Sequence, residues 1–269
     1  MGERPGDGAS KVTEGIVFGP NVERLVSELA PDERVLDVGG WACPFNRAQW
    51  VVDIEPFETR GHYASFGGPR CQGPDVEWFT KDTWVQRDVC DHTPLPFADK
   101  AFDFAVCSHT LEDVRDPIWV CSELVRIARR GYIEVPSRTF ESSVGAERRG
   151  QAGLSHHRWL IDIEGQRIRF LPKYHMIHTA WRFHLPERCL RGLSQEATVQ
   201  WLWWNDTFTF EEVTIHGVEA QEAELERFAQ TAGQRPAWMY DVDRAVRQVS
   251  GIPRRAASWA VRQARRVAV

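Results

Sequence analysis

The fold is decided by the segment Arg34-Val35-Leu36-Asp37-Val38-Gly39-Gly40. A short apolar run closed by glycine is typical of a buried parallel strand that runs into a tight turn. Glycine has no Cβ, so the backbone at that point can turn sharply and approach a ligand closely. The segment therefore predicts an α/β domain with a ligand-binding turn at the carboxyl end of its first strand.

Strands and helices alternate around this segment. Further short apolar runs predict strands at residues 50–54, 84–87, 102–107 and 132–135. Apolar side chains at helical spacing predict helices at residues 21–29 and 116–128, with Gly131 capping the second helix. This alternation is typical of a doubly wound, mostly parallel sheet covered by helices on both faces. We expect residues 16–137 to form this core and residues 1–15 to form a flexible arm.

Two antiparallel strand pairs are predicted after Pro136. Residues 159–163 and 167–171 alternate apolar and polar side chains around a central glycine, which indicates a hairpin. Residues 198–204 and 207–215 have the pattern of a second antiparallel pair joined through Asn-Asp. We therefore expect this part of the chain to add a hairpin and to complete the sheet.

The remaining domain boundaries follow from these patterns. Residues 138–239 are expected to complete the sheet and cover the ligand pocket. Residues 240–269 form a helical tail that contains seven arginines. A basic helix can lie on an anionic membrane surface, so peripheral membrane contact is one hypothesis for this tail. The alternative is a solvated helix face.

Composition excludes several classes of protein. The formal net charge is −5, which argues against nucleic acid as the main partner because phosphate binding needs a basic surface. No apolar run approaches the roughly 20 residues of a membrane span. The six cysteines contain no CxxC pair, so we expect free thiols in a reducing, cytoplasmic environment rather than a zinc knuckle or a disulfide framework.

Acidic side chains follow three successive predicted strands. Asp37 precedes the two glycines, Asp53 ends the next strand, and Asp88 follows the third. A carboxylate at the end of the second strand can accept hydrogen bonds from both ribose hydroxyls, and one after the third can accept from an adenine amino group. The segment Ser108-His109-Thr110-Leu111-Glu112 then gives the fourth strand a polar end. Together these features predict a site for an adenosine-type cofactor.

The order of the motifs VLDVGG, VVDIEP, RDVCD, LPFADKAFDFAVCSHTLEDV and GYIEVPS resembles class I S-adenosylmethionine-dependent methyltransferases over about residues 20–137. The resemblance implies a Rossmann-like, seven-stranded sheet with an antiparallel last strand, and S-adenosylmethionine as cofactor. The usual third glycine is replaced within Trp41-Ala42-Cys43-Pro44. A glycine pair followed by proline is similar to bacterial methyltransferases that act on sugars and specialised metabolites. A nicotinamide site is the weaker alternative because GxGxxG is absent.

The resemblance also assigns residues to parts of the cofactor. It implies that Asp37, Gly39 and Gly40 line the methionine end and that Asp53 binds the ribose. Asp88 and Val89 would hold the adenine, while Ser108 and His109 face the reacting end. Their neighbours Trp41 and Ile54 complete the predicted cofactor site.

Three histidines are candidates for a general base that takes the proton from a hydroxyl acceptor, namely His109, His156 and His157. The alternatives are a capping role for His109 and a surface pair for the other two. No clustered carboxylate motif appears, and His175 and His178 lack a third ligand at suitable spacing, so we expect no metal.

The predicted reaction is O-methylation of a sugar hydroxyl on a small-molecule or lipid-linked glycan, or on a glycosylated metabolite. Sugars stack well on indole rings, and five tryptophans lie between residues 155 and 205: Trp159, Trp181, Trp201, Trp203 and Trp204. One alternative is methylation of an aromatic or polyketide-type natural product. Another is a catalytically inactive, methyltransferase-like binding subunit.

Overall fold

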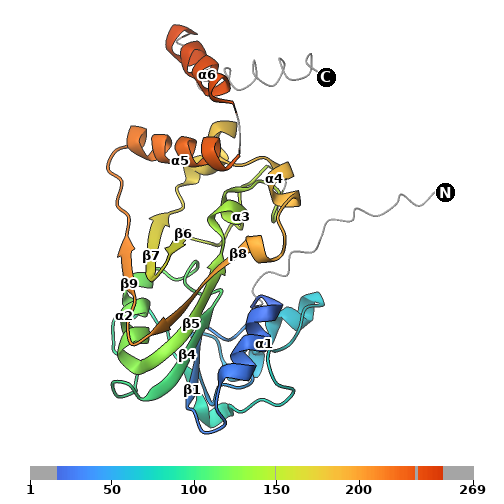
Figure 1. Ribbon diagram of the computed structural model, residues 1–269, viewed down its shortest axis with the longest axis vertical. Coiled ribbons are helices and arrows are strands. Elements are labelled where there is room, and N and C mark those ends of the chain that lie inside the picture. The colour runs from blue at the N-terminus through green and yellow to red at the C-terminus, as the bar shows by residue number, and fades with distance from the viewer. Residues whose placement is uncertain (1–16, 149, 234–235, 251–269) are drawn as a thin grey trace, which may run out of the picture. The chain divides into compact units, whose positions relative to one another are not determined.

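The computed structural model describes residues 17–148, 150–233 and 236–250 (Figure 1). The predicted arm at residues 1–15 and most of the arginines of the predicted tail lie outside these residues. The chain divides into two compact units. The sheet unit comprises residues 1–138, 156–172 and 193–213, and the helical unit comprises residues 139–155, 173–192 and 214–269.

A six-stranded sheet forms the centre of the sheet unit, in the order β3-β2-β1-β4-β5-β8. The strands are β1 (Val35–Val38), β2 (Trp50–Asp53), β3 (Trp84–Gln86), β4 (Phe102–Ser108), β5 (Ala128–Pro136) and β8 (Val199–Asn205). All neighbours pair in parallel except β8, which runs antiparallel to β5. The mostly parallel α/β sheet with an antiparallel last strand is therefore confirmed, but the prediction of seven strands is wrong.

Helices cover both faces of this sheet. Leu25 of α1 (Gly19–Glu28) belongs to the same buried cluster as Phe104 of β4. Leu124 of α2 (Pro117–Ile127) belongs to the cluster that contains Ala105 and Cys107. Because successive residues of a strand point to opposite faces, the two helices lie on opposite sides of β4.

The glycine predicted to cap α2 lies inside β5 instead. α2 ends at Ile127, and Gly131 pairs with Ala105 on one side and with Trp204 on the other. A Cβ at this position would lie 2.4 Å from the Ala105 carbonyl oxygen and 2.7 Å from the Trp204 ring. Glycine is needed here by close packing within the sheet rather than by a helix end.

A three-stranded sheet, in the order β6-β7-β9, completes the sheet unit. β6 (Trp159–Glu164) and β7 (Arg167–Pro172) form the predicted antiparallel hairpin. β9 (Thr209–Glu212) pairs in parallel with β7, so the predicted pairing of residues 198–204 with 207–215 is wrong. The chain leaves β8 on one sheet and enters β9 on the other. β9 therefore cannot supply a seventh strand to the larger sheet.

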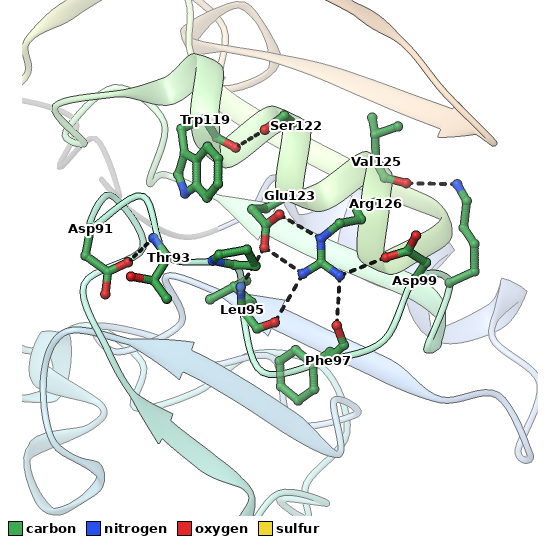
Figure 2. A network of polar contacts seen from close by, with 12 residues as sticks. Asp91, Thr93, Leu95, Phe97, Asp99, Trp119, Ser122, Glu123, Val125 and Arg126 are labelled. Carbon is green, nitrogen blue, oxygen red and sulfur yellow. Dashed lines mark hydrogen bonds and ion pairs between the residues drawn. The ribbon is translucent and has the colours of Figure 1, made fainter.

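Arg126 of α2 fixes the turn that precedes β4 (Figure 2). Its guanidinium donates to the carbonyl oxygens of Leu95, at 3.1 Å, and Phe97, at 2.8 Å, and it pairs with Glu123 at 2.7 Å. The Glu123 carboxylate in turn accepts from the Leu95 N–H at 2.6 Å. These bonds hold the connection between β3 and β4 against α2, and so fix where β4 begins.

The long connection between β2 and β3 contains only short 3-10 helices, at Phe57–Thr59, His62–Phe66 and Lys81–Thr83. A further one, Glu196–Thr198, precedes β8.

The helical unit is built around α5 (Val218–Ala232) and α6 (Ala237–Ser250). Its smaller elements are α3 (Arg138–Ser142, whose first residue is in the sheet unit), α4 (Glu187–Arg191) and the 3-10 helices His175–His178 and Trp181–Phe183. A buried ion pair joins Lys173 to Glu141 at 2.7 Å, and the same ammonium donates to the Leu154 carbonyl oxygen. Within the described ranges, no helix combines the length and the apolar character required to cross a membrane.

Candidate cofactor and acceptor site

The glycine turn after β1 needs both of its glycines. Gly39 has a φ of +81°, and a Cβ there would lie 2.1 Å from the Thr110 hydroxyl oxygen. A Cβ on Gly40 would lie 2.2 Å from a carboxylate oxygen of Asp37. The turn is therefore packed directly against the ends of β1 and β4, and any side chain at these two positions would displace it.

Asp37 lies beneath this turn. Its carboxylate is buried and accepts from the Phe45 N–H at 2.9 Å. Burial raises the pKa of Asp37 to about 7. Asp37 therefore has a positioning role, because its carboxylate holds the loop that follows the glycines. A direct contact between Asp37 and the methionine end of a cofactor stays a prediction.

Asp53 connects the glycine turn to the end of β2. Its two carboxylate oxygens accept from the N–H groups of Trp41, at 3.0 Å, and Glu55, at 2.9 Å. Burial raises the pKa of Asp53 to about 6. An ionised carboxylate offers about four lone-pair positions, so these two bonds leave acceptor capacity for ribose hydroxyls. The next residue, Ile54, is 59% exposed and offers an apolar surface beside the carboxylate.

The Trp41 side chain belongs to the wall formed by the connection after β2. Its indole N–H donates to the Thr59 hydroxyl at 2.9 Å, and its ring stacks on His62 with centroids 4.6 Å apart. The backbone of Trp41 thus contacts Asp53 while its ring is held by the 57–66 segment.

Asp88, the predicted adenine contact beside Val89, is paired with Arg115. The distance between the Arg115 guanidinium and the carboxylate is 2.6 Å, and the Cys90 N–H donates to the same carboxylate at 2.8 Å. Although partial burial raises the pKa of Asp88, these two bonds lower it below its ordinary value. The contact between Asp88 and Arg115 was not predicted from the sequence. The two residues follow the ends of β3 and β4, which are separated by β2 and β1 in the sheet, so no local pattern indicates that they meet.

His109 lies between two carboxylates at the end of β4, directly after Ser108. Its Nε2 is 3.2 Å from Glu134, and its Nδ1 is 3.5 Å from Glu112. Burial by itself lowers the pKa of His109, but the hydrogen bonds to Glu112 and Glu134 raise it to about 10. An imidazole that is already protonated on both ring nitrogens cannot accept a further proton. The geometry therefore favours a positioning role for His109 over the predicted role of general base.

Glu134 joins His109 to the amino-terminal helix. It is fully buried and accepts from the Phe18 N–H at 2.9 Å, from the Asn21 amide at 3.2 Å and from the Tyr132 hydroxyl. Burial, together with the negative charge of Glu134, raises the pKa of Tyr132. This network was not predicted from the sequence, because its one local signal is that Tyr132 and Glu134 occupy the same face of β5.

The two other candidate bases meet Asp113 in the sheet unit. His157 is 6% exposed, and its Nε2 lies 3.8 Å from a carboxylate oxygen of Asp113. The rings of His156 and His157 pack edge to face, with centroids 4.5 Å apart. One donor atom from each of the three side chains lies within 4.8 Å of the other two. This cluster was not predicted, because Asp113 is distant in sequence from both histidines.

The five tryptophans between residues 155 and 205 pack against other aromatic rings. Their partners are Phe170 for Trp159, Tyr240 for Trp181, Phe18 for Trp201, Tyr132 for Trp203 and Phe208 for Trp204. This part of the chain is therefore rich in aromatic residues because of packing. The packing gives no support to the prediction that these rings stack on a sugar.

One part of the chain matches a known protein family. Residues 71–133, less than a quarter of the chain, match the family described as Methyltransferase domain. No curated protein matches the chain.

Two solved structures illustrate the similarity. The S-adenosylmethionine-dependent methyltransferase of Mesorhizobium loti is 18% identical; the match covers 56% of this chain and 61% of that chain, with a TM-score of 0.31. The arsenic(III) S-adenosylmethionine methyltransferase of Chlamydomonas reinhardtii is 15% identical; the match covers 44% of this chain and 49% of that chain, with a TM-score of 0.27. The chain spans about half the length of the solved structures that it matches. The strand order and the family match at residues 71–133 together identify the fold as the Rossmann-like α/β fold of methyltransferases.

Proposed function

We propose that the protein binds S-adenosylmethionine at the carboxyl ends of β1, β2 and β4 and transfers its methyl group to a hydroxyl acceptor. The observation that carries the proposal is the bond from the Trp41 N–H to the Asp53 carboxylate at 3.0 Å. This bond joins the glycine turn and the acidic end of β2 into one surface. Ligands of open α/β sheets bind at this edge, at the point where the strand order reverses. In this sheet that point lies between β1 and β4.

The residues present fit the cofactor. Asp53 keeps acceptor capacity for two ribose hydroxyls, and the exposed side chain of Ile54 can pack against the adenine face. The Gly39-Gly40 turn allows the backbone to approach the methionine end without a Cβ in the way. Asp88 shares its carboxylate with Arg115, so we expect it to orient the adenine loop and to contribute less binding energy than Asp53.

The reaction requires alignment more than chemical activation. When bound, S-adenosylmethionine supplies an electrophilic methyl group on a sulfonium. Holding an acceptor oxygen in line with it can supply roughly 7 to 11 kcal/mol of the barrier reduction. A hydroxyl acceptor must also lose its proton. We assign assistance with this deprotonation to the group formed by Asp113, His156 and His157, because His109 is held protonated between two carboxylates.

A sugar hydroxyl is the proposed acceptor, free, lipid-linked or attached to a metabolite. The support is the resemblance of the Gly39-Gly40…Pro44 motif to bacterial sugar methyltransferases and the presence of imidazoles suited to hydroxyl chemistry. The packed tryptophans add nothing to this part of the proposal. A phenolic natural product is the competing acceptor.

Calorimetry with S-adenosylmethionine and its demethylated product tests the cofactor site. We expect saturable binding by the wild-type protein and loss of most of the affinity in Asp53→Ala. Asp82→Ala, which removes an exposed carboxylate from the connection before β3, is the matched control and should bind as the wild type does. The absence of binding heat in a folded wild-type protein would favour the inactive binding subunit. Methyl transfer to panels of nucleotide sugars and phenols then separates the two acceptor classes.

A further inference from the structure

Asp113, His156 and His157 have the composition of a transition-metal site. Two imidazole nitrogens and one carboxylate oxygen are a donor set that suits zinc, iron and related divalent ions and leaves coordination positions open. Among the residues that the structure describes, this is the group of three ligand-type side chains that comes within such reach.

The distances are close to those of a bound ion. Metal–ligand bonds of about 2.1 Å at tetrahedral angles place neighbouring donor atoms about 3.4 Å apart. The Nε2 of His157 and the Oδ1 of Asp113 are 3.8 Å apart, and the three donor atoms all lie within 4.8 Å of one another. Closing the site therefore shortens the donor–donor distances by at most about 1.4 Å, which rotation about side-chain χ angles can provide.

The backbone that carries these side chains is fixed. The Asp113 N–H donates to the Thr110 carbonyl oxygen at 3.1 Å, in the turn that follows β4. The Arg158 N–H donates to the Glu112 carbonyl oxygen at 2.7 Å, which docks the His156-His157 segment onto that turn. All three candidate ligands belong to the sheet unit. Because both backbone segments of the cluster are already fixed, little conformational entropy is lost when an ion binds.

The surroundings favour a cation. Glu112, which precedes Asp113, is 1% exposed, and one of its carboxylate oxygens lies 3.5 Å from the Nδ1 of His109. Glu134 is also fully buried, and it contacts the other ring nitrogen of His109 at 3.2 Å. Two buried carboxyl groups thus flank one imidazole in the segment next to Asp113.

We propose that Asp113, His156 and His157 bind one divalent transition-metal ion at the same edge of the sheet as the glycine turn. Thr110 connects the two places, since its hydroxyl donates to the Val38 carbonyl oxygen at 3.3 Å and its own carbonyl accepts from Asp113. The catalytic role of the ion rests on the proposed function. As a Lewis acid it would lower the pKa of a bound acceptor hydroxyl, and the imidazoles would act as ligands instead of as a base.

Zinc binding to the full chain tests the site without reference to catalysis. The protein is first stripped with a chelator and then titrated with Zn²⁺ by calorimetry, in the absence of any cofactor. We expect one equivalent to bind, and the dissociation constant to rise at least tenfold in each of His157→Gln, His156→Gln and Asp113→Asn. Co²⁺ gives a second measurement, because its visible absorption should change on binding to the wild type and not to the variants.

His175→Gln is the matched control, since this exposed histidine lies outside the cluster and should leave zinc affinity unchanged. His156 is exposed whereas His157 is buried, so His156→Gln should fold normally. A loss of zinc affinity in this variant therefore reports loss of a ligand and not misfolding. Absence of stoichiometric binding by the wild type, or wild-type affinity in either cluster-histidine variant, overturns the proposal. Binding of S-adenosylmethionine in the same preparation reports on the proposed function separately: cofactor binding without zinc binding removes only the metal site, and the reverse removes only the methyltransferase.

Discussion

Asp53→Asn should change stability and cofactor affinity in opposite directions. The ionised carboxylate is unfavourable in the free protein because burial raises its pKa from 3.8 to about 6. At about 1.4 kcal/mol per pKa unit, this corresponds to about 3 kcal/mol of destabilisation at pH 7. Asparagine removes that penalty but keeps only one of the two backbone acceptor bonds, at a cost of about 1 kcal/mol. We therefore expect the variant to be about 2 kcal/mol more stable than the wild type.

The pH dependence of this difference follows from the direction of the shift. A carboxyl group with a raised pKa in the folded state binds its proton more readily there than in the unfolded chain. The penalty is therefore complete above about pH 6 and is relieved as the pH falls toward 3.8. The ionisation penalty falls to roughly half between pH 7 and pH 5, so the net stability gain of Asp53→Asn should fall from about 2 to about 0.6 kcal/mol.

Cofactor affinity should fall in the same variant. Hydrogen bonds to a charged acceptor contribute about 1.5 to 3 kcal/mol, so the dissociation constant for S-adenosylmethionine should rise by about 10- to 100-fold. Urea unfolding of wild type and variant at pH 7 and pH 5 gives the stability difference, and calorimetry at pH 7 gives the affinity. Unchanged affinity in the variant, or a stability difference that does not vary with pH, would refute the reasoning.

Three further predictions concern the scaffold, and urea unfolding measures each. Gly39→Ala combines a positive φ with a steric clash, so its free energy of unfolding should fall by about 2 to 4 kcal/mol. Gly67 also has a positive φ but no atom near its Cβ, so Gly67→Ala should lower the free energy of unfolding by only about 1 kcal/mol. Equal losses in the two variants would show that the clash at Gly39 is relieved. Arg126→Met leaves a buried carboxylate and two carbonyl oxygens without their partner and should lose about 3 kcal/mol. Arg129→Met removes only a weak, exposed ion pair at 3.7 Å and should change stability by less than about 0.5 kcal/mol, and a comparable loss there would contradict the role given to Arg126. Tyr132→Phe removes a hydroxyl from the buried network and should lose about 1 to 3 kcal/mol, an expectation that fails if the variant is as stable as the wild type.

The parallel core could be predicted from the sequence because its signals are local. Short apolar runs and the glycines at the end of β1 determine both the strands and the turn, and the structure places the strands where those runs occur. The pairing of β8 could not be predicted in this way. An Asn-Asp pair between two alternating segments favours a hairpin locally, but the open edge of β5 offers seven paired residues, and this long-range pairing prevails.

The candidate site divides in the same manner. The positions of Asp53 and the two glycines at strand ends could be predicted because each follows or ends its own apolar run. The surroundings of His109 were not, since its partner Glu134 comes from another strand, and Phe18 and Asn21 approach from the amino-terminal end of the described chain. The meeting of Asp113 with His156 and His157 likewise depends on how two distant segments dock.

The division of the chain into two interleaved units affects how the protein can be shortened. The backbone passes between the sheet unit and the helical unit five times, so neither can be produced as one uninterrupted fragment. A polypeptide that stops at residue 138 would contain the glycine turn but would lack β8. The exposed edge of β5 would then offer unpaired backbone groups to other molecules, which is a common route to aggregation. Insoluble expression of such a fragment would therefore reflect an incomplete sheet and not an unstable cofactor pocket.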